Sequence, residues 1–201
     1  IAEGTASHAE GTNTKASGHY SHAEGSNTIA SGDVSHAEGG GTIASGNRSH
    51  TEGQYTTASG NAAHAEGDGT TASGLTSHAE GFHAKASGKY AHSEGQQTTA
   101  SGQNTHAEGE STSASGTGSH AEGGNTTTAG RYSHAEGLQT TTFGEAAHAE
   151  GKSTNKYSSA GVTTSTHNND ILSKWRSKQF SLAKGANSHI EGRDSLALGA
   201  Q

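Results

Sequence analysis

Small side chains alternate with larger polar ones along most of the chain, and this pattern repeats every 14 residues. Each repeat has two related halves of seven residues, Ser-His-Ala-Glu-Gly-x-x and Thr-x-Ala-Ser-Gly-x-x. Five residues with small groups at alternate positions predict a short strand, whose side chains point in turn to its two faces. Glycine followed by two variable, mostly polar residues predicts a tight turn. The unit is therefore strand, turn, strand, turn, which is one flattened coil of a β-solenoid.

A helical interpretation of the repeat fails on composition. Glycine recurs every seven residues, and each glycine costs about 1 kcal/mol relative to alanine inside a helix. A coiled coil would need large apolar residues at two heptad positions, where this chain has Ser, Thr and Ala. Parallel coils spaced by about 4.8 Å would instead make the repeats a rod about 50 Å long.

The alternation assigns each side chain to the inside or the outside of the coil. The small residues of both halves are expected to line a thin interior, in the first coil Ser7, Ala9, Gly11, Thr14, Ala16 and Gly18. The His and Glu of the first half must then point outward and stack into two columns. The outward places of the second half vary from Lys15 to Ile29 and Thr57. Variation suits open solvent, whereas an unchanged His and Glu face suggests a fixed partner.

Composition strengthens the expectation of a partner. Hydrophobic residues make up 26% of the chain and aromatic residues 4%, against about 45–50% apolar usage in ordinary globular domains. Most of the 26% is alanine, and burial contributes only about 25 cal/mol per Å² of apolar surface. That gain must offset about 1–2 kcal/mol of backbone entropy for each ordered residue. A single thin solenoid is therefore marginal, and we expect several chains to associate through the unchanged face.

Charge and cysteine content exclude several classes of protein. The formal charge of −7 is spread along the chain, so there is no basic footprint for nucleic acid. The absence of cysteine excludes a disulfide scaffold and a thiolate metal site. No apolar run approaches the roughly 20 residues that cross a bilayer. Because the chain starts at Ile1 within a repeat, without methionine or a signal peptide, we expect it to be a piece of a longer protein.

The repeat resembles the head domains of YadA-like trimeric autotransporter adhesins, whose 14-residue repeats read Ser-Val-Ala-Ile-Gly-x-x-Ser-x-Ala-x-Gly-x-x. The resemblance covers residues 1–154 and 181–201, and it is carried in each unit by positions equivalent to Ser21, Ala23, Gly25, Thr28, Ala30 and Gly32. It is closest at Ser181-Leu-Ala-Lys-Gly185 and Ser195-Leu-Ala-Leu-Gly199, with Ser188-His-Ile-Glu-Gly192 between them. It implies a left-handed parallel β-roll, three chains around one axis, and exposure at the tip of a surface fibre. The His-Ala-Glu repeats are also similar to those of bacteriophage tail fibres.

One departure from the family pattern concerns the axis of the trimer. In the family, the Val and Ile places face the axis and form an apolar seam; here His and Glu occupy them. The seam is therefore expected to be a polar ladder, in which imidazole donates to carboxylate between chains. The expected ladder comprises His8, Glu10, His22, Glu24, His36, Glu38, His50, Glu52, His64, Glu66, His78, Glu80, His92, Glu94, His106, Glu108, His120, Glu122, His134, Glu136, His148 and Glu150. Leucine returns at these places within residues 181–201, where an apolar plug would close the seam.

Histidine beside carboxylate also suits metal binding, and three symmetric imidazoles could ligate Zn, Ni or Cu on the axis. We favour a structural ladder, with no metal site and no cofactor, and keep bound ions or anions as an alternative. No nucleophile, base and orienting group occur together outside the repeat, so catalysis is not expected. Ice binding was weighed for the threonine column Thr28, Thr42, Thr56 and Thr70, but adjacent threonines point to opposite faces.

The repeat stops after Thr154, and residues 157–180 hold the only tryptophan. Asp170 would cap a short helix that carries Ile171, Leu172 and Trp175, although a hairpin also fits. We interpret the segment as a joint or plug that covers the solenoid end, because solenoids need caps. The alternative is a receptor contact through Lys174, Trp175 and Arg176.

These observations predict an all-β chain in three parts. Residues 1–156 form the 14-residue-repeat β-roll, residues 157–180 form a joint or insertion, and residues 181–201 resume the roll. The predicted function is that of a non-enzymatic extracellular fibre or adhesin-head segment. It is expected to be a homotrimeric spacer on the bacterial cell surface or a virion tail, and to attach to a host-cell surface protein or glycan. The alternatives are a receptor-binding phage tail fibre and a metal- or anion-binding β-roll.

Overall fold

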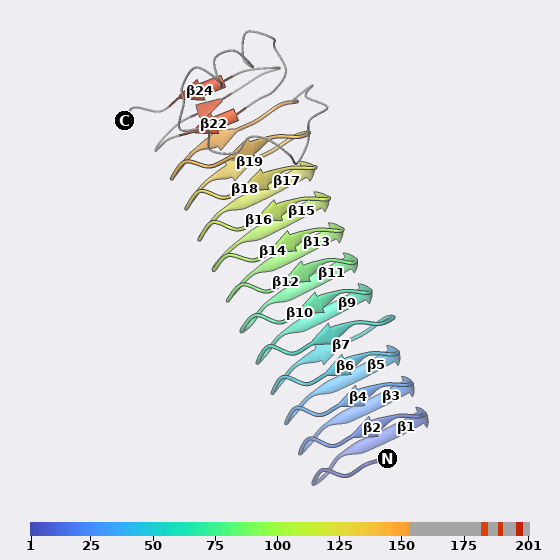
Figure 1. Ribbon diagram of the computed structural model, residues 1–201. Helices are drawn as coiled ribbons and strands as arrows, with labels where there is room; N and C mark the ends of the chain where they lie inside the picture. Colours follow the sequence, from blue (N-terminus) through green and yellow to red (C-terminus); the bar gives the residue numbers. More distant parts are fainter. Residues whose placement is uncertain (153–181, 185–188, 191–195, 199–201) are drawn as a thin grey trace.

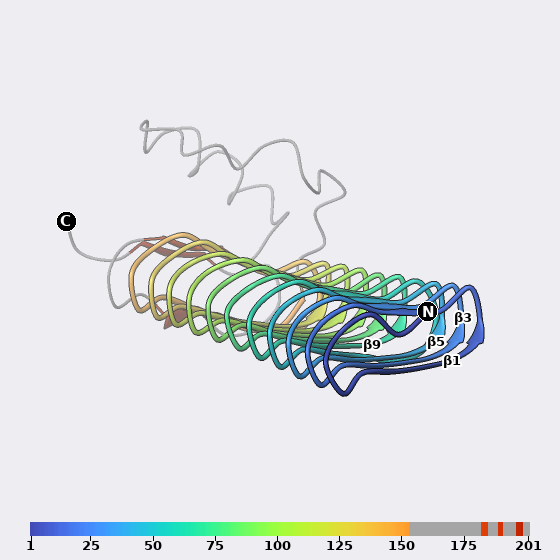
Figure 2. The same cartoon turned by 90° about the horizontal axis from the view of Figure 1, so that it is seen from below.

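A computed structural model of the chain describes residues 1–152, 182–184, 189–190 and 196–198. These residues form a parallel β-solenoid with coils of 14 residues, and each coil contributes two short strands (Figure 1). Viewed after a 90° turn, the coils are flattened loops stacked along one axis (Figure 2). The predicted solenoid, its coil length and its two strands per coil are confirmed.

The strands build two parallel sheets of 12 strands each. The sheet of the first half-repeats consists of β1 (His8–Thr12), β3 (His22–Ser26), β5 (His36–Gly40), β7 (His50–Thr51), β9 (His64–Asp68), β11 (His78–Phe82), β13 (His92–Gln96), β15 (His106–Glu110), β17 (His120–Gly124), β19 (His134–Ala135), β21 (His148–Ala149) and β23 (His189–Ile190). The sheet of the second half-repeats consists of β2 (Lys15–Ala16), β4 (Ile29–Ala30), β6 (Ile43–Ala44), β8 (Thr57–Ala58), β10 (Thr71–Ala72), β12 (Lys85–Ala86), β14 (Thr99–Ala100), β16 (Ser113–Ala114), β18 (Thr127–Thr128), β20 (Thr141–Thr142), β22 (Leu182–Lys184) and β24 (Leu196–Leu198).

The pairing register places each residue on its equivalent in the next coil, for example His22 on His36 and Glu24 on Glu38. The same register extends to the C-terminal strands, where β20 pairs with β22 and β21 with β23. Residues 157–180, with the predicted helix after Asp170, lie outside the described residues. No helix long and apolar enough to cross a bilayer occurs in the part of the chain that the structure describes.

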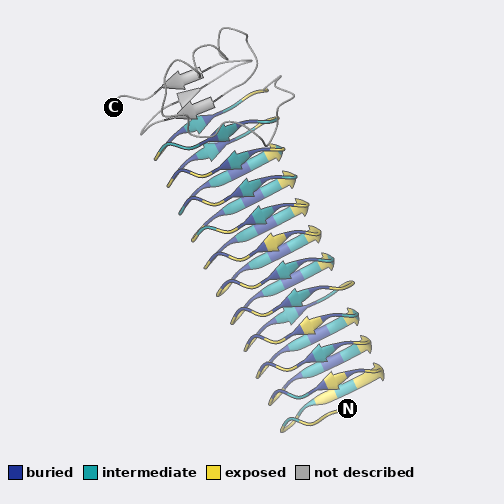
Figure 3. Ribbon diagram, in the orientation of Figure 1, coloured by how far each residue is buried: buried dark blue, intermediate teal, exposed yellow. Residues whose placement is uncertain are grey.

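The interior is as thin as the alternation predicts, because alanine, threonine and serine fill it. Ala23, Thr28 and Ala30 have no exposed surface, and Ser21 is 2% exposed. The buried positions follow one another along the rod, while the turns at its two edges are exposed (Figure 3). The serine of the first half-repeat also fastens the preceding turn, since Ser35 Oγ donates to the Gly32 carbonyl at 2.6 Å.

The two half-repeats are less alike than their sequences suggest. Within residues 1–152 the second-half strands have only two residues, such as Ile29–Ala30, and not the five that we expected, whereas most first-half strands have five. The first-half glycines, among them Gly11 and Gly25, are exposed and not interior, because the strand continues through them with φ near +105° at Gly25. The second-half glycine Gly32 is buried as expected. The two half-repeats share one sequence pattern, but the chain turns differently after each of them.

Candidate functional site: the histidine and glutamate columns

The first-half sheet presents one column of histidines and one column of glutamates on its outer surface. The alternation along each strand sends Ala23 inward and His22 and Glu24 outward, where both side chains are about two-fifths exposed, 40% and 37%. In-register pairing then repeats the arrangement in every coil from β1 to β21. The structure therefore brings the predicted His and Glu residues of 8–150 together on one face, pointing out of the coil as expected.

The histidine rings stack face to face along this surface. The ring centroids of His22 and His36 are 4.8 Å apart with an interplanar angle of 7°, and those of His106 and His120 are 4.7 Å apart at 2°. The stack ends at the N-terminal coil, where His8 meets His22 edge-on at 82°. Strand spacing fixes the ring separation, so the imidazoles form one continuous column of preset orientation.

Ten of the eleven histidines from His8 to His148, all but His50, also pair with the glutamate two residues later in the same coil. The Nε2–Oε2 distance is 3.6 Å for His22 and Glu24, and 3.5 Å for His106 and Glu108. Hydrogen bonds between nitrogen and oxygen are shorter, at about 2.7–3.2 Å, and the terminal His8–Glu10 contact at 3.2 Å is of that kind. Inside the stack, the pairs of one chain are close enough to attract but too far apart to hydrogen-bond.

The glutamate column brings like charges close together, and protons shared between neighbouring coils reduce the repulsion between the carboxylates. A hydrogen bond with Glu80, followed by one with Glu52, raises the pKa of Glu66 to about 7. The same contacts with Glu66 lower the pKa of both Glu52 and Glu80 below the ordinary value. Glu66 therefore keeps a proton more tightly than an ordinary glutamate, and Glu52 and Glu80 on either side of it accept hydrogen bonds from it.

Burial within the stack lowers the pKa of several histidines. Burial, followed by the charges of His50 and His22, lowers the pKa of His36. Burial is also the main cause that lowers the pKa values of His64 and His92. The lowered pKa favours the neutral form of His36, His64 and His92, which keeps a nitrogen lone pair.

A shallow open groove of about 460 Å³ follows the glutamate column. It is lined by Glu10, Glu24, Gly25, Glu38, Gly39, Glu52, Gly53 and Gly67. The exposed first-half glycines create the groove, because they leave no side chain beside the carboxylates. Our sequence analysis missed it, since it placed these glycines in the interior.

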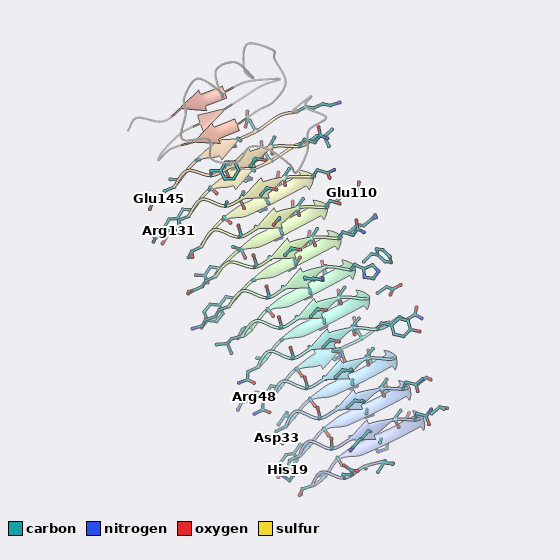
Figure 4. All side chains as sticks on the ribbon, in the orientation of Figure 1. His19, Asp33, Arg48, Glu110, Arg131 and Glu145 are labelled. Carbon is teal, nitrogen blue, oxygen red and sulfur yellow. The ribbon has the colours of Figure 1, made fainter. Side chains whose placement is uncertain are left out.

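The turn edges of the coil are exposed and vary from coil to coil. His19, Asp33, Arg48, Arg131 and Glu145 project from one edge, and Glu110 projects from the opposite edge (Figure 4). Two turns on the first edge pair a cation with an aromatic ring: Lys89 Nζ lies 4.8 Å from the Tyr90 ring centroid, and the Arg131 guanidinium carbon lies 5.3 Å from that of Tyr132.

Other candidate sites from the sequence have different outcomes. Thr28, Thr42, Thr56 and Thr70 are fully buried, so this column is not available to ice and that interpretation is wrong. The candidate receptor contact Lys174, Trp175 and Arg176 lies outside the described residues and stays a prediction.

Comparison with known families agrees with the geometry. The family described as YadA head domain repeat (2 copies) matches residues 23–49, 52–77 and 93–119. Among curated proteins, none matches the chain. The matched segments lie between β3 and β16, where the parallel register is continuous. The chain therefore contains YadA head domain repeats.

Proposed function

We propose that the chain is a segment of an extracellular homotrimeric fibre, which acts as a rigid spacer and takes part in attachment to a host-cell surface protein or glycan. The three chains form a left-handed β-roll assembly, in which the histidine and glutamate columns of each chain face the common axis. The YadA head repeats support this proposal, because that family is one of surface adhesin heads. Parallel β-solenoids built from such repeats are typical of structural proteins and not of enzymes.

The observation that carries the proposal is the contrast between a very small interior and one unchanged outer face. Alanine, threonine and serine fill the coil, so one chain buries little apolar surface per residue. The His and Glu face repeats without change, whereas the opposite sheet presents Lys15, Ile29 and Thr57 at one equivalent position. A surface that stays constant over many coils fits a partner with the same repeat, which a second copy of the chain provides.

The polar chemistry of the face also fits a trimer. In one chain, the Nε2 atom of His106 is shielded from solvent and has no hydrogen-bond partner among the described residues. Two further chains around a threefold axis would bring their own Glu carboxylates to the same layer. An interchain hydrogen bond from imidazole to carboxylate would then satisfy both groups, which a buried seam requires.

Attachment is assigned to the surfaces that vary. The turn edges carry exposed aromatic and charged side chains, including Tyr90, Arg131 and Tyr132, and such residues are frequent in binding hot spots. The candidate contact at Lys174, Trp175 and Arg176 belongs to the same proposal. In this arrangement the constant face assembles the fibre, and the variable surfaces meet the host.

Sedimentation equilibrium of the chain in a chelating buffer tests the assembly. With a chain mass of 20.1 kDa, a trimer gives about three times that value. Glu66→Arg should destabilise the trimer, because it places three cations, one from each chain, in one layer of the axis beside the histidine column. Glu110→Arg is the matched control, since it makes the same charge change at the exposed edge and should leave the trimer intact. A monomeric wild-type chain, or equal behaviour of the two variants, would contradict the proposal.

A further inference from the structure

We propose that the histidine and glutamate columns bind Zn²⁺, with one ion held between neighbouring coils by a histidine and a glutamate of one strand and a histidine of the next. This site goes beyond the fibre function and uses only ligands of one chain; where an ion is bound, Nε2 holds it in place of the interchain hydrogen bond. It would give the rod a row of metal sites that the sequence analysis considered only as an alternative. Three separate sets of ligands that share no residue are His36, Glu38 and His50; His64, Glu66 and His78; and His92, Glu94 and His106.

The first argument is the spacing of the donor atoms. Nε2 and Oε2 lie 3.6 Å apart in the His64–Glu66 pair and 3.5 Å apart in the His92–Glu94 pair. Two ligands on a tetrahedral zinc ion, each bonded at about 2.0–2.1 Å, are about 3.4 Å apart. The pairs are thus too long for a hydrogen bond and close to the spacing that a zinc ion sets between its ligands.

The second argument is the state of the imidazole nitrogen. The Nε2 atoms of His36, His64 and His92 are shielded from solvent and lack a hydrogen-bond partner within the described part of the chain. Metals bind the lone pair of the neutral imidazole ring. A shielded lone pair beside a carboxyl group fits a nitrogen and oxygen ligand set, in which the bound ion displaces the proton that Glu66 shares with its neighbours.

The third ligand comes from the stacking of the coils. In each set all three donor atoms lie within 4.8 Å of one another. This upper limit exceeds the tetrahedral spacing, so the histidine of the next coil must tilt toward the ion. The side chains on this face are about one-third exposed, for example 35% at His64 and 31% at Glu66. That exposure leaves room for the tilt and for water at the fourth position.

The donor set also selects the ion. Imidazole nitrogen with carboxylate oxygen suits zinc and its transition-metal neighbours, whereas Mg²⁺ and Ca²⁺ prefer oxygen ligands alone. Because each ion needs histidines from two coils, and because divalent ions in adjacent coils would repel one another, we expect about one ion for every two coils.

Equilibrium dialysis of the untagged chain against Zn²⁺, with metal measured by mass spectrometry, tests the site. Mg²⁺ dialysis runs in parallel. The column variant carries Glu38→Gln, Glu66→Gln and Glu94→Gln. The matched control carries Glu3→Gln, Glu110→Gln and Glu145→Gln, which removes three carboxylates from exposed positions outside the column. Circular dichroism checks that both variants keep the wild-type strand signal.

We expect zinc to be retained well above magnesium, the column variant to retain less zinc than the wild-type chain, and the control to retain as much as the wild type. X-ray absorption of the zinc-loaded wild-type chain should show nitrogen and oxygen ligands at about 2.0–2.1 Å with the outer-shell scattering of imidazole. Zinc retention no greater than that of magnesium, equal losses in the two variants, or a spectrum without imidazole would overturn the proposal. If the column variant does not fold, the wild-type spectrum decides alone. Sedimentation in chelator reports the trimer independently, so either proposal can fail without the other.

Discussion

Replacement of Gly60 by alanine tests how closely the coils stack. Gly60 is buried and its φ is not positive, so the backbone conformation itself accepts alanine. A Cβ atom there would lie 1.9 Å from the Gly74 carbonyl oxygen of the next coil, against the 3.4 Å or more of an ordinary contact. The two coils must therefore separate locally by about 1.5 Å to restore normal van der Waals distance.

That separation breaks the backbone hydrogen bonds at this corner. The amides of Ser59 and Gly60 both donate to the Ala72 carbonyl, at 3.0 and 3.3 Å. Each buried group that loses its partner costs about 1–3 kcal/mol, so Gly60→Ala should lower the free energy of unfolding by about 2–6 kcal/mol. Because each coil contacts only its neighbours, the damage should centre on the junction between the coils of Gly60 and Gly74.

Urea denaturation followed by circular dichroism, at one fixed protein concentration, measures the effect, and hydrogen exchange locates it. Gly40→Ala is the matched control, because the nearest atom to its added Cβ is Gln54 Cγ at 4.0 Å. The control should be neutral or more stable by about 0.4–1 kcal/mol. Equal stability of the two variants would refute the close-stacking argument.

Three further predictions concern single side chains. Thr56→Val should raise the free energy of unfolding by about 1 kcal/mol, because among the described residues the buried Thr56 Oγ1 has no hydrogen-bond partner. Thr70→Val should lower it by a similar amount, because Thr70 Oγ1 donates to the Glu66 carbonyl at 3.1 Å. Denaturant midpoints of the two variants that move in the same direction would contradict this. Val34→Asn should raise the melting temperature and add about 1 kcal/mol, because Val34 has a φ of 59°, which asparagine tolerates better than a β-branched residue; a lower melting temperature would speak against strain at this turn. In carboxyl NMR, Glu66 should titrate near pH 7, and Glu52 and Glu80 should titrate below the ordinary glutamate value. Since the folded chain holds the Glu66 proton more tightly than the unfolded chain, the contribution of Glu66 to stability falls as pH rises from about 4.5 to about 7. Three titration midpoints near 4.5 would disprove the shared proton.

The period of the sequence was enough to predict the solenoid, its register and the two outward columns. A strict 14-residue repeat leaves one way to place every His on a His, and alternation along a strand then decides which side chains point outward. The corners could not be predicted in the same way. Gly25 and Gly32 occupy equivalent places in sequence, and each faces the carbonyl of the equivalent glycine in the next coil, yet only Gly25 has a positive φ.

The backbone preferences of single residue types also do not predict the conformation at some turns. Val34 and Thr76 adopt φ values of 59° and 52°, which β-branched residues rarely do. The Val34 amide donates to the His19 carbonyl of the preceding coil at 2.8 Å, so contacts between coils impose the conformation. The spacing of 3.5 Å between Nε2 and Oε2 of His92 and Glu94 likewise depends on rotamers, which residue types alone do not specify.

The central claim is that the histidine and glutamate face lies at the axis of a trimer, and thiol cross-linking tests it most directly. The chain contains no cysteine, so Glu66→Cys and Lys85→Cys each introduce a single thiol, on the first-half and second-half sheets. With a short thiol-specific cross-linker, Glu66→Cys should give covalent dimers that leave every third chain unlinked, because one of three thiols around the axis has no partner. Lys85→Cys should stay uncross-linked at the same concentration. Cross-linking through Lys85→Cys with none through Glu66→Cys would contradict the account.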